Sequence, residues 1–418
     1  MIDWDKWQEI YLTLKKHKLR TSLTAFGVFW GIFMLVVLLG AGNGLKNGVV
    51  GMFGGQSNTV YMWSGTPTQI PYAGMQKGRK LALKDEDLAA IRQGCPELDV
   101  LTGNNDLGHW QGAQYVVRGE KFGAFPTKGT QPANAKLKAY STQLGRYINA
   151  MDIDEKRKVA VIGTRVQETL FNPDENPIGQ SIEIRGIYFL VVGVFKGPKT
   201  GDNAQEAAET VLIPNSTLRY TFNQLGWIGH IELTPKPGFD AVALEEKVKK
   251  IIMERNRVHP DDMGVVGSFN VQKEFNKFMD LFAGITAFSW AVAIGTLFAG
   301  AIGVGNIMLI VVKERTKEIG VRKAIGATSA SIVAMVIQEA LVITLFAGYW
   351  GLAVAVFLLE SITKLLGDGN GGMFSNPEIN LSTAFIAMAI LVVAALFAAL
   401  LPASKAAGVN PIVALQDE

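Results

Sequence analysis

The sequence predicts a membrane protein with four transmembrane α-helices and a large α+β extracytoplasmic domain between helices 1 and 2. Of its 418 residues, 49% are hydrophobic and 18% are charged, whereas soluble domains carry about 25% charged residues. Four long apolar segments lie near the N-terminus and in the last third of the chain. The stretch between the first two segments has the composition of an ordinary soluble domain.

Each of the four apolar segments is long enough to cross a bilayer, whose core takes about 20 mostly apolar residues per helix. The predicted spans are residues 21–41, 281–312, 332–359 and 383–402. The first is longer than the core of a signal peptide and follows acidic residues, so we expect it to be retained. The second and third spans are longer than one crossing of the bilayer requires, so we expect each helix to tilt or to extend beyond the bilayer. The helical pattern of the second begins as early as Gln272, which predicts a stalk.

The distribution of lysine and arginine predicts the orientation. Basic residues crowd the stretch before the first span and the loop of residues 313–331, whereas the loop of residues 360–382 contains Lys364 alone. By the positive-inside rule, both termini and the 313–331 loop are expected in the cytoplasm. Residues 42–280 are then outside, and residues 403–418 form a cytoplasmic tail.

Residues 1–20 are predicted to form an amphipathic helix on the cytoplasmic membrane surface. Trp4, Trp7, Tyr11 and Leu14 recur at helical spacing, and lysines follow them. This pattern suits a helix whose aromatic rings lie in the headgroup layer. A disordered tail is the alternative.

Residues 42–280 alternate short strand-like and helix-like segments, which predicts a mixed α+β domain in two subdomains. The expected strands are short, β-branched or aromatic, and bounded by turn residues: 59–63, 114–118, 159–162, 188–194, 211–213 and 230–233. The expected helices are 84–93, which has an acidic first turn, and 241–256. Glycine, proline and lysine crowd residues 125–136 and 196–202, where we expect exposed loops.

The sequence shows no catalytic, cofactor or metal site, so the chain is not expected to be an enzyme. It contains no GxxxxGK[ST] phosphate loop, and therefore no ATP binding is expected; GxSxG and HExxH are also absent. The pairs Asp152–Asp154 and Asp261–Asp262 are expected to be solvated rather than catalytic. The single cysteine, Cys95, excludes an intrachain disulfide and a cysteine metal centre. A net charge of +3 is too small for a nucleic-acid partner.

The loop of residues 313–331 carries the most informative pattern. Charges alternate in sign from Lys313 to Glu318, and apolar residues recur from Ile319 to Ile325 before Gly326 ends the helix. An amphipathic hairpin between two membrane helices suits docking in a groove of another protein. A basic loop that merely satisfies topology is the alternative, and periodicity alone does not decide between them.

The same segment resembles the signature of the MacB-type ABC-transporter permeases, also called FtsX-like. The family pattern corresponds here to Asn306–Leu309, Glu314–Gly320 and Arg322–Ala327. Shorter similarities extend the resemblance over nearly the whole chain: 19–24, 159–163, 189–194, 401–407 and 410–415. Met335 departs from the family, many members of which have Gln at this position.

This resemblance implies a permease subunit that couples ATP hydrolysis to substrate export by mechanotransmission. Because the first predicted span already begins at residue 21, the fused ATP-binding domain of MacB is expected to be absent. The resemblance then implies a separate ABC ATPase. The family also implies a dimer with a second permease copy or paralogue, two ATPase subunits, a periplasmic adaptor as a further partner, and the bacterial inner membrane. The alternatives are a lipoprotein-release permease of the same fold and a membrane-anchored sensor without transport.

The resemblance places the ATPase contact on the 313–331 hairpin. Two apolar residues are expected to insert near the contact centre, and four charged residues to line its rim: Ile319 and Ala324, then Glu314, Arg315, Glu318 and Arg322. Glu339 lies about two turns into the third span. An intramembrane carboxylate suggests function, but an interfacial or helix-packing role is the favoured interpretation here.

Overall fold

The computed structural model describes residues 18–53, 58–108, 112–197, 202–366, 374, 377 and 381–411. Residues 1–17 of the predicted amphipathic helix lie outside the described residues, as do most of the 360–382 loop and the end of the tail. The chain divides into two compact units. We call residues 1–47, 280–370 and 374–418 the membrane unit, and residues 48–279 with 371–373 the extracytoplasmic unit.

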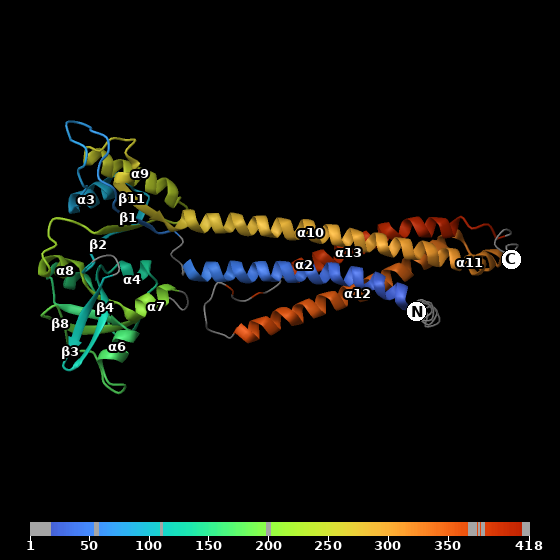
Figure 1. Cartoon of the computed structure of the whole chain (residues 1–418), viewed down its shortest axis with the longest axis horizontal. Coiled ribbons are helices and arrows are strands. Elements are labelled where there is room, and N and C mark those ends of the chain that lie inside the picture. The colour runs from blue at the N-terminus through green and yellow to red at the C-terminus, as the bar shows by residue number, and fades with distance from the viewer. Residues whose placement is uncertain are drawn as a thin grey trace. The chain divides into compact units, whose positions relative to one another are not determined.

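The membrane unit is built on four long helices: α2 Lys18–Phe53, α10 Val271–Glu314, α12 Ser329–Leu366 and α13 Leu381–Ala407 (Figure 1). Each contains a stretch long and apolar enough to cross a membrane. The predicted fold class, with an α+β domain between the first and second of these helices, is confirmed. At 44 residues, α10 is the longest, and its start at the end of the last strand confirms the early onset expected for the second span.

Small residues allow these helices to pack closely. A methyl group at Gly305 in α10 would lie 2.9 Å from the carbonyl oxygen of Ala398 in α13. One at Gly351 in α12 would lie 2.6 Å from the carbonyl oxygen of Phe29 in α2. Such contacts matter because lipid offers no hydrophobic driving force between helices. One apolar cluster joins the four helices.

One sheet of the extracytoplasmic unit has four antiparallel strands in the order β11-β1-β10-β2. Its strands are β1 Val60–Ser64, β2 Leu98–Asn104, β10 His230–Pro235 and β11 Val266–Asn270. Helices α3 Asp85–Gly94 and α9 Ala241–Arg255 pack on one face of this sheet and bury an apolar core there (Figure 1). A short 3-10 helix, η1 Met263–Val265, precedes β11.

The other sheet has seven strands in the order β5-β8-β6-β9-β4-β3-β7, and β8 also pairs with β7, so the sheet closes on itself. The strands are β3 Ala113–Arg118, β4 Lys121–Thr130, β5 Ser141–Gly145, β6 Val159–Gly163, β7 Ser181–Ile184, β8 Ile187–Lys196 and β9 Val211–Pro214. The accompanying helices are α4 Asn134–Leu137, α5 Ala150–Asp154, α6 Thr164–Leu170, α7 Asp202–Glu209 and α8 Asn215–Thr221. This sheet has its own apolar core.

The six predicted strands and two predicted helices of the extracytoplasmic unit are confirmed with nearly the expected bounds. The loop expected at residues 125–136 is wrong at both ends. β4 continues through Thr130, where it pairs in parallel with β9, and α4 begins at Asn134. The loop expected at residues 196–202 lies mostly outside the described residues.

The expectation that both acidic pairs are solvated is wrong for one member of each. Asp152 is fully buried, and its Oδ1 lies 3.0 Å from Nη2 of Arg146. Asp262 is 5% exposed, and its Oδ2 accepts a hydrogen bond of 2.7 Å from the backbone N–H of Gln69. Both carboxylates therefore hold backbone and side chains in place, whereas Asp154 is exposed.

Candidate coupling site

The 313–331 hairpin contains a short helix, α11 Thr316–Ala324, set between α10 and α12. The chain leaves helical geometry at Arg315, which joins α10 to α11. At the other end Gly326 adopts φ = +102°, a conformation that L side chains rarely adopt. This residue ends the helix and turns the chain toward α12.

One side of α11 presents apolar surface. Val321 is 43% exposed and Ile325, directly after the helix, is 80% exposed. Ala324 and Lys317 are exposed beside them. At about 100° per residue these four positions share one side of the helix. We call them the outer face of α11.

Ile319 lies on the opposite side of the helix, which corrects the expectation that it inserts into a partner. Its side chain is 2% exposed and belongs to the apolar cluster of the membrane unit, together with Val312 and Val336. Because about 200° separates Ile319 from Val321 around the helix axis, the two cannot face the same groove. Of the two predicted apolar contacts, Ala324 is on the accessible side.

The four predicted charged residues divide between the surface and a chain of ion pairs. Glu314 is exposed at the end of α10. Arg315 Nε lies 3.0 Å from Glu318 Oε2, and Arg315 Nη1 lies 3.5 Å from Glu339 Oε2. Arg322 Nη2 lies 2.9 Å from Glu318 Oε1. The pair with Glu339 connects the hairpin to α12, and the other two pairs lie within the hairpin.

Lys323 fixes α11 to the end of α13. Its Nζ donates hydrogen bonds to the carbonyl oxygens of Ala407 and, at 3.0 Å, of Val409. Carbonyl groups at a helix C-terminus lack intrahelical partners and carry partial negative charge, so a lysine there is stabilising. This contact was not expected from the sequence.

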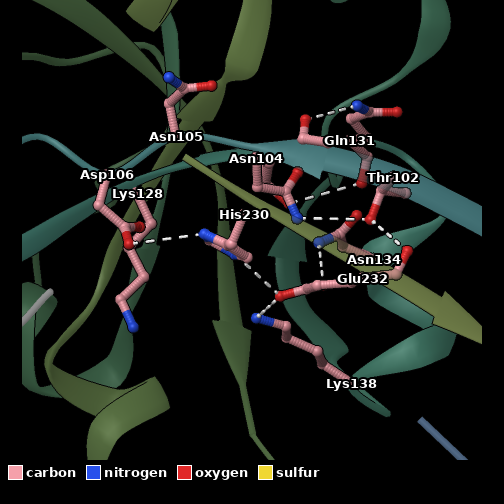
Figure 2. A network of polar contacts seen from close by, with 12 residues as sticks. Thr102, Asn104, Asn105, Asp106, Lys128, Gln131, Asn134, Lys138, His230 and Glu232 are labelled. Atoms are coloured by element: carbon pink, nitrogen blue, oxygen red, sulfur yellow. Dashed lines mark hydrogen bonds and ion pairs between the residues drawn. The ribbon is translucent and has the colours of Figure 1, made fainter. Parts of the chain in front are cut away.

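A second polar site, which sequence reasoning missed, lies in the extracytoplasmic unit between its two sheets (Figure 2). The register places Thr102 beside Glu232 and Asn104 beside His230 on the face of the four-stranded sheet away from α3 and α9. Segments that follow β4 cover this face. The side-chain amide of Gln131, for example, donates to the carbonyl oxygen of Gly103 at 2.8 Å.

Glu232 is the centre of this network and is fully buried. Its Oε1 lies 2.8 Å from Lys138 Nζ and 3.3 Å from His230 Nε2. Its Oε2 accepts a hydrogen bond of 2.8 Å from Asn134 Nδ2. His230 Nδ1 lies 3.9 Å from Asp106 Oδ2 on its other side. Figure 2 shows His230 and Glu232 of β10 close to Asn134 and Lys138, which come from the segment around α4.

The ion pair sets the charge of both partners. Burial by itself raises the pKa of Glu232, but the Lys138 ammonium and the hydrogen bond from His230 outweigh it and lower that pKa to about 2. Burial likewise lowers the pKa of Lys138, whereas Glu232 holds it well above its usual value. Both groups are therefore charged at neutral pH. Removal of either one would leave the other as a buried charge without a partner.

The depressed pKa of Glu232 makes stability pH-dependent. A carboxylate with a lower pKa in the folded than in the unfolded state stabilises fully above about pH 4.5, and this stabilisation is lost as pH falls toward 2. We expect Glu232→Gln to be less stable than the native chain by about 3 kcal/mol at pH 7. Urea unfolding of both proteins from pH 7 to pH 2 should show that the difference between their free energies of unfolding decreases below pH 5. A difference that stays constant over this range would contradict the assignment.

In the part of the chain that the structure describes, no group of three or more His, Cys, Asp or Glu side chains could hold a metal ion. The buried charges and amides link the four-stranded sheet to α4 and the residue that follows it. A polar, hydrogen-bonded contact of this kind fixes one relative arrangement of the elements that it joins.

Comparison with known proteins agrees with this architecture. Residues 21–251 match the MacB-like periplasmic core domain, and residues 290–411 match the FtsX-like permease C-terminal domain. The macrolide export ATP-binding/permease protein MacB of Bdellovibrio bacteriovorus is 26% identical over 98% of this chain. The pyoverdine export ATP-binding/permease protein PvdT of Pseudomonas putida is 28% identical over 96% of it. The chain spans 61% and 58% of the length of these two relatives.

Among solved structures, the periplasmic region of MacB from Actinobacillus actinomycetemcomitans aligns with 55% of this chain and 95% of its own length, at 17% identity and a TM-score of 0.43. The family match to the core domain alone covers more than half of the sequence. The chain therefore belongs to the family of MacB-like permeases with an FtsX-like C-terminal region.

Proposed function

We propose that this chain is the permease subunit of an ABC exporter and that α11 is the helix on which a separate ATPase docks. The observation that carries the proposal is the outer face of α11, an exposed apolar patch in the loop between two membrane helices. Membrane proteins normally present polar residues at such loops, and an exposed apolar patch rimmed by charges is typical of an interaction site. Lys317, which belongs to this face, and the neighbouring Arg322 supply charge beside its apolar residues.

The length of α10 supports transmission of movement across the membrane. This single helix of 44 residues begins directly after β11 and ends at the joint with α11. At about 1.5 Å per residue it is about 66 Å long, more than twice the thickness of a bilayer core. We propose that a displacement of the joint at Arg315 would be transmitted along α10, which is helical from Val271 to Glu314.

We propose the wider assembly from what the family resemblance implies. The relatives are named for macrolide and pyoverdine export, so we propose export of a substrate from the cell or from the periplasm, in the bacterial inner membrane. The complex would contain two permeases and two ATPases, with a periplasmic adaptor as a further partner. The coupling residues would be Ala324 with Val321 and Ile325 at the centre, and Glu314, Arg315, Glu318 and Arg322 around them.

Affinity purification from native membranes in mild detergent tests this function. We expect an ABC ATPase to co-purify in equal amount with the permease and to be the chain that hydrolyses ATP. Co-purification of lipoprotein-carrier proteins with an ATPase would favour the lipoprotein-release alternative. Recovery of the permease without any ATPase would contradict the proposal and favour a sensor.

The proposed orientation can be checked by labelling single cysteines with an impermeant maleimide in spheroplasts. Cys95 is 1% exposed, and a Cys95→Ser background removes it. Ser141 and Thr328 are both exposed, one in the extracytoplasmic unit and one in the hairpin. We expect a cysteine at 141 to react and one at 328 to react only after the membrane is permeabilised. The reverse pattern would invert the topology.

A further inference from the structure

The joint between α10 and α11 is fastened to α12 by a buried carboxylate. Glu339 lies in α12, and its side chain is 6% exposed. Arg315 sits at the joint itself, and its side chain is 18% exposed. The two make an ion pair at 3.5 Å between Nη1 and Oε2. This contact links the joint to α12 across 24 positions of the sequence.

Arg315 also contacts α11 through the rest of its guanidinium group. Nε and Nη2 lie 3.0 Å and 3.2 Å from the two carboxylate oxygens of Glu318. A guanidinium presents five N–H donors in a fixed plane, so one side chain can hold two carboxylates in a defined geometry. Lysine has the same charge but no such fork. The side chain at the joint is therefore suited to fixing an angle as well as to balancing charge.

The environment makes this ion pair costly to break. A carboxylate inside a membrane helix is strongly disfavoured unless it is paired. Around it, Ile319, Val336 and Ala340 form apolar packing between α11 and α12. Buried ion pairs contribute little net stability, and their best-attested role is to specify one arrangement of the helices that they join.

We propose that Glu339 is a positioning residue that acts through Arg315 to lock the α10–α11 joint to α12, so that a load on α11 moves α10 and α12 together. This inference rests on the proposed docking of an ATPase on α11. Without this ion pair, α11 would still bind the ATPase through its outer face. The angle between α10 and α11 would then change under load, and the movement would not reach the extracytoplasmic unit.

The test uses the purified permease–ATPase complex in lipid nanodiscs. Hydrogen exchange of the extracytoplasmic unit is measured with and without ATP for the native chain and for Glu339→Gln. We expect Glu339→Gln to keep its ATPase and to hydrolyse ATP, but to lose the ATP-dependent difference in exchange. Glu339→Asp, which keeps the charge, should retain the difference.

Glu360 provides a matched control, because it is an exposed carboxylate near the other end of the same helix. Glu360→Gln is expected to behave like the native chain. An ATP-dependent difference that persists in Glu339→Gln, or loss of the ATPase from that variant, would overturn the inference while the proposed function stands. No ATP-dependent difference in the native complex would count against the proposed function itself.

Two further variants keep the inference testable if Glu339→Gln folds poorly. Arg315→Lys retains the positive charge without the fork, and we expect it to lose the ATP-dependent difference as well. The double variant Arg315→Met with Glu339→Met removes both charges and should restore folding, since apolar replacement of a buried pair is often neutral. It should remain uncoupled; a coupled double variant would overturn the inference.

Discussion

Replacing Lys138 with methionine is expected to destabilise the extracytoplasmic unit by about 3–5 kcal/mol, because it leaves the Glu232 carboxylate buried without a countercharge. Glu232 is fully buried and Lys138 Nζ lies 2.8 Å from it. Asn134 and His230 would remain within hydrogen-bond distance of the carboxylate, but the lysine ammonium that lies against it would be lost. Urea dependence of hydrogen exchange at the β10 amides of the full chain measures the loss.

Lys136 is the matched control for this prediction. It lies two positions before Lys138, is 83% exposed, and its Nζ is 3.8 Å from Asp99 Oδ2. Exposed ion pairs of this kind contribute about 0–1 kcal/mol, so Lys136→Met should leave β10 protection nearly unchanged. Equal effects at positions 136 and 138 would show that the buried pair does not hold the segment around α4 to the four-stranded sheet.

Ile325→Glu is expected to weaken capture of the ATPase by about thirtyfold or more. Its side chain is 80% exposed at the end of α11, and an apolar residue at the centre of an interface typically contributes about 2 kcal/mol or more. The substitution places a charge in the contact without touching the core. Quantitative pull-down of the ATPase from detergent extracts, with the amount of inserted permease measured separately, gives the result.

Two other substitutions separate docking from folding. Leu365→Glu changes an 86% exposed residue near the other end of α12 and should leave capture unchanged. Ile319→Asp places a carboxylate at a 2% exposed position and should reduce the amount of folded permease rather than its affinity for the ATPase. Full capture by Ile325→Glu would contradict docking on the outer face.

Composition and length were sufficient to predict the membrane helices, because crossing a bilayer imposes one requirement on every span. The short strands were also predictable where β-branched residues lie between turn residues. The end of β4 could not be predicted from the sequence. Gly129 resembled a loop residue, yet a methyl group there would lie 2.2 Å from Asn215 Oδ1 and 2.9 Å from the Asn105 carbonyl oxygen. The glycine permits close approach of two backbones within the sheet.

The buried network was hidden by the alternation of β10. His230, Glu232 and Thr234 alternate with the buried residues Ile231 and Leu233, a pattern that normally indicates a solvated polar face. That face is instead covered by another part of the domain. A single strand contains no signal of what packs on its polar side, so the pairing with Lys138 could not be predicted from local sequence.

The short helix in the 313–331 hairpin was predicted correctly, but its accessible side was not. Ile319, Val321 and Ile325 are all apolar residues in or next to one short helix. Their spacing does not show which of them is buried. Packing against α12 decides the matter, since Ile319 enters the apolar cluster and the other two remain outside. The partner of Glu339 likewise depends on the hairpin bringing Arg315 back to α12, a contact between residues distant in the sequence.

Site-specific photocrosslinking in intact cells tests the central claim most directly. A photoreactive phenylalanine analogue is placed singly at Ile325, Ile319 or Met263, the last being a 68% exposed residue of the extracytoplasmic unit. Docking on α11 predicts an ATPase adduct from position 325 and none from positions 319 and 263. Absence of an ATPase adduct at 325, in cells where the ATPase co-purifies with the permease, would contradict it.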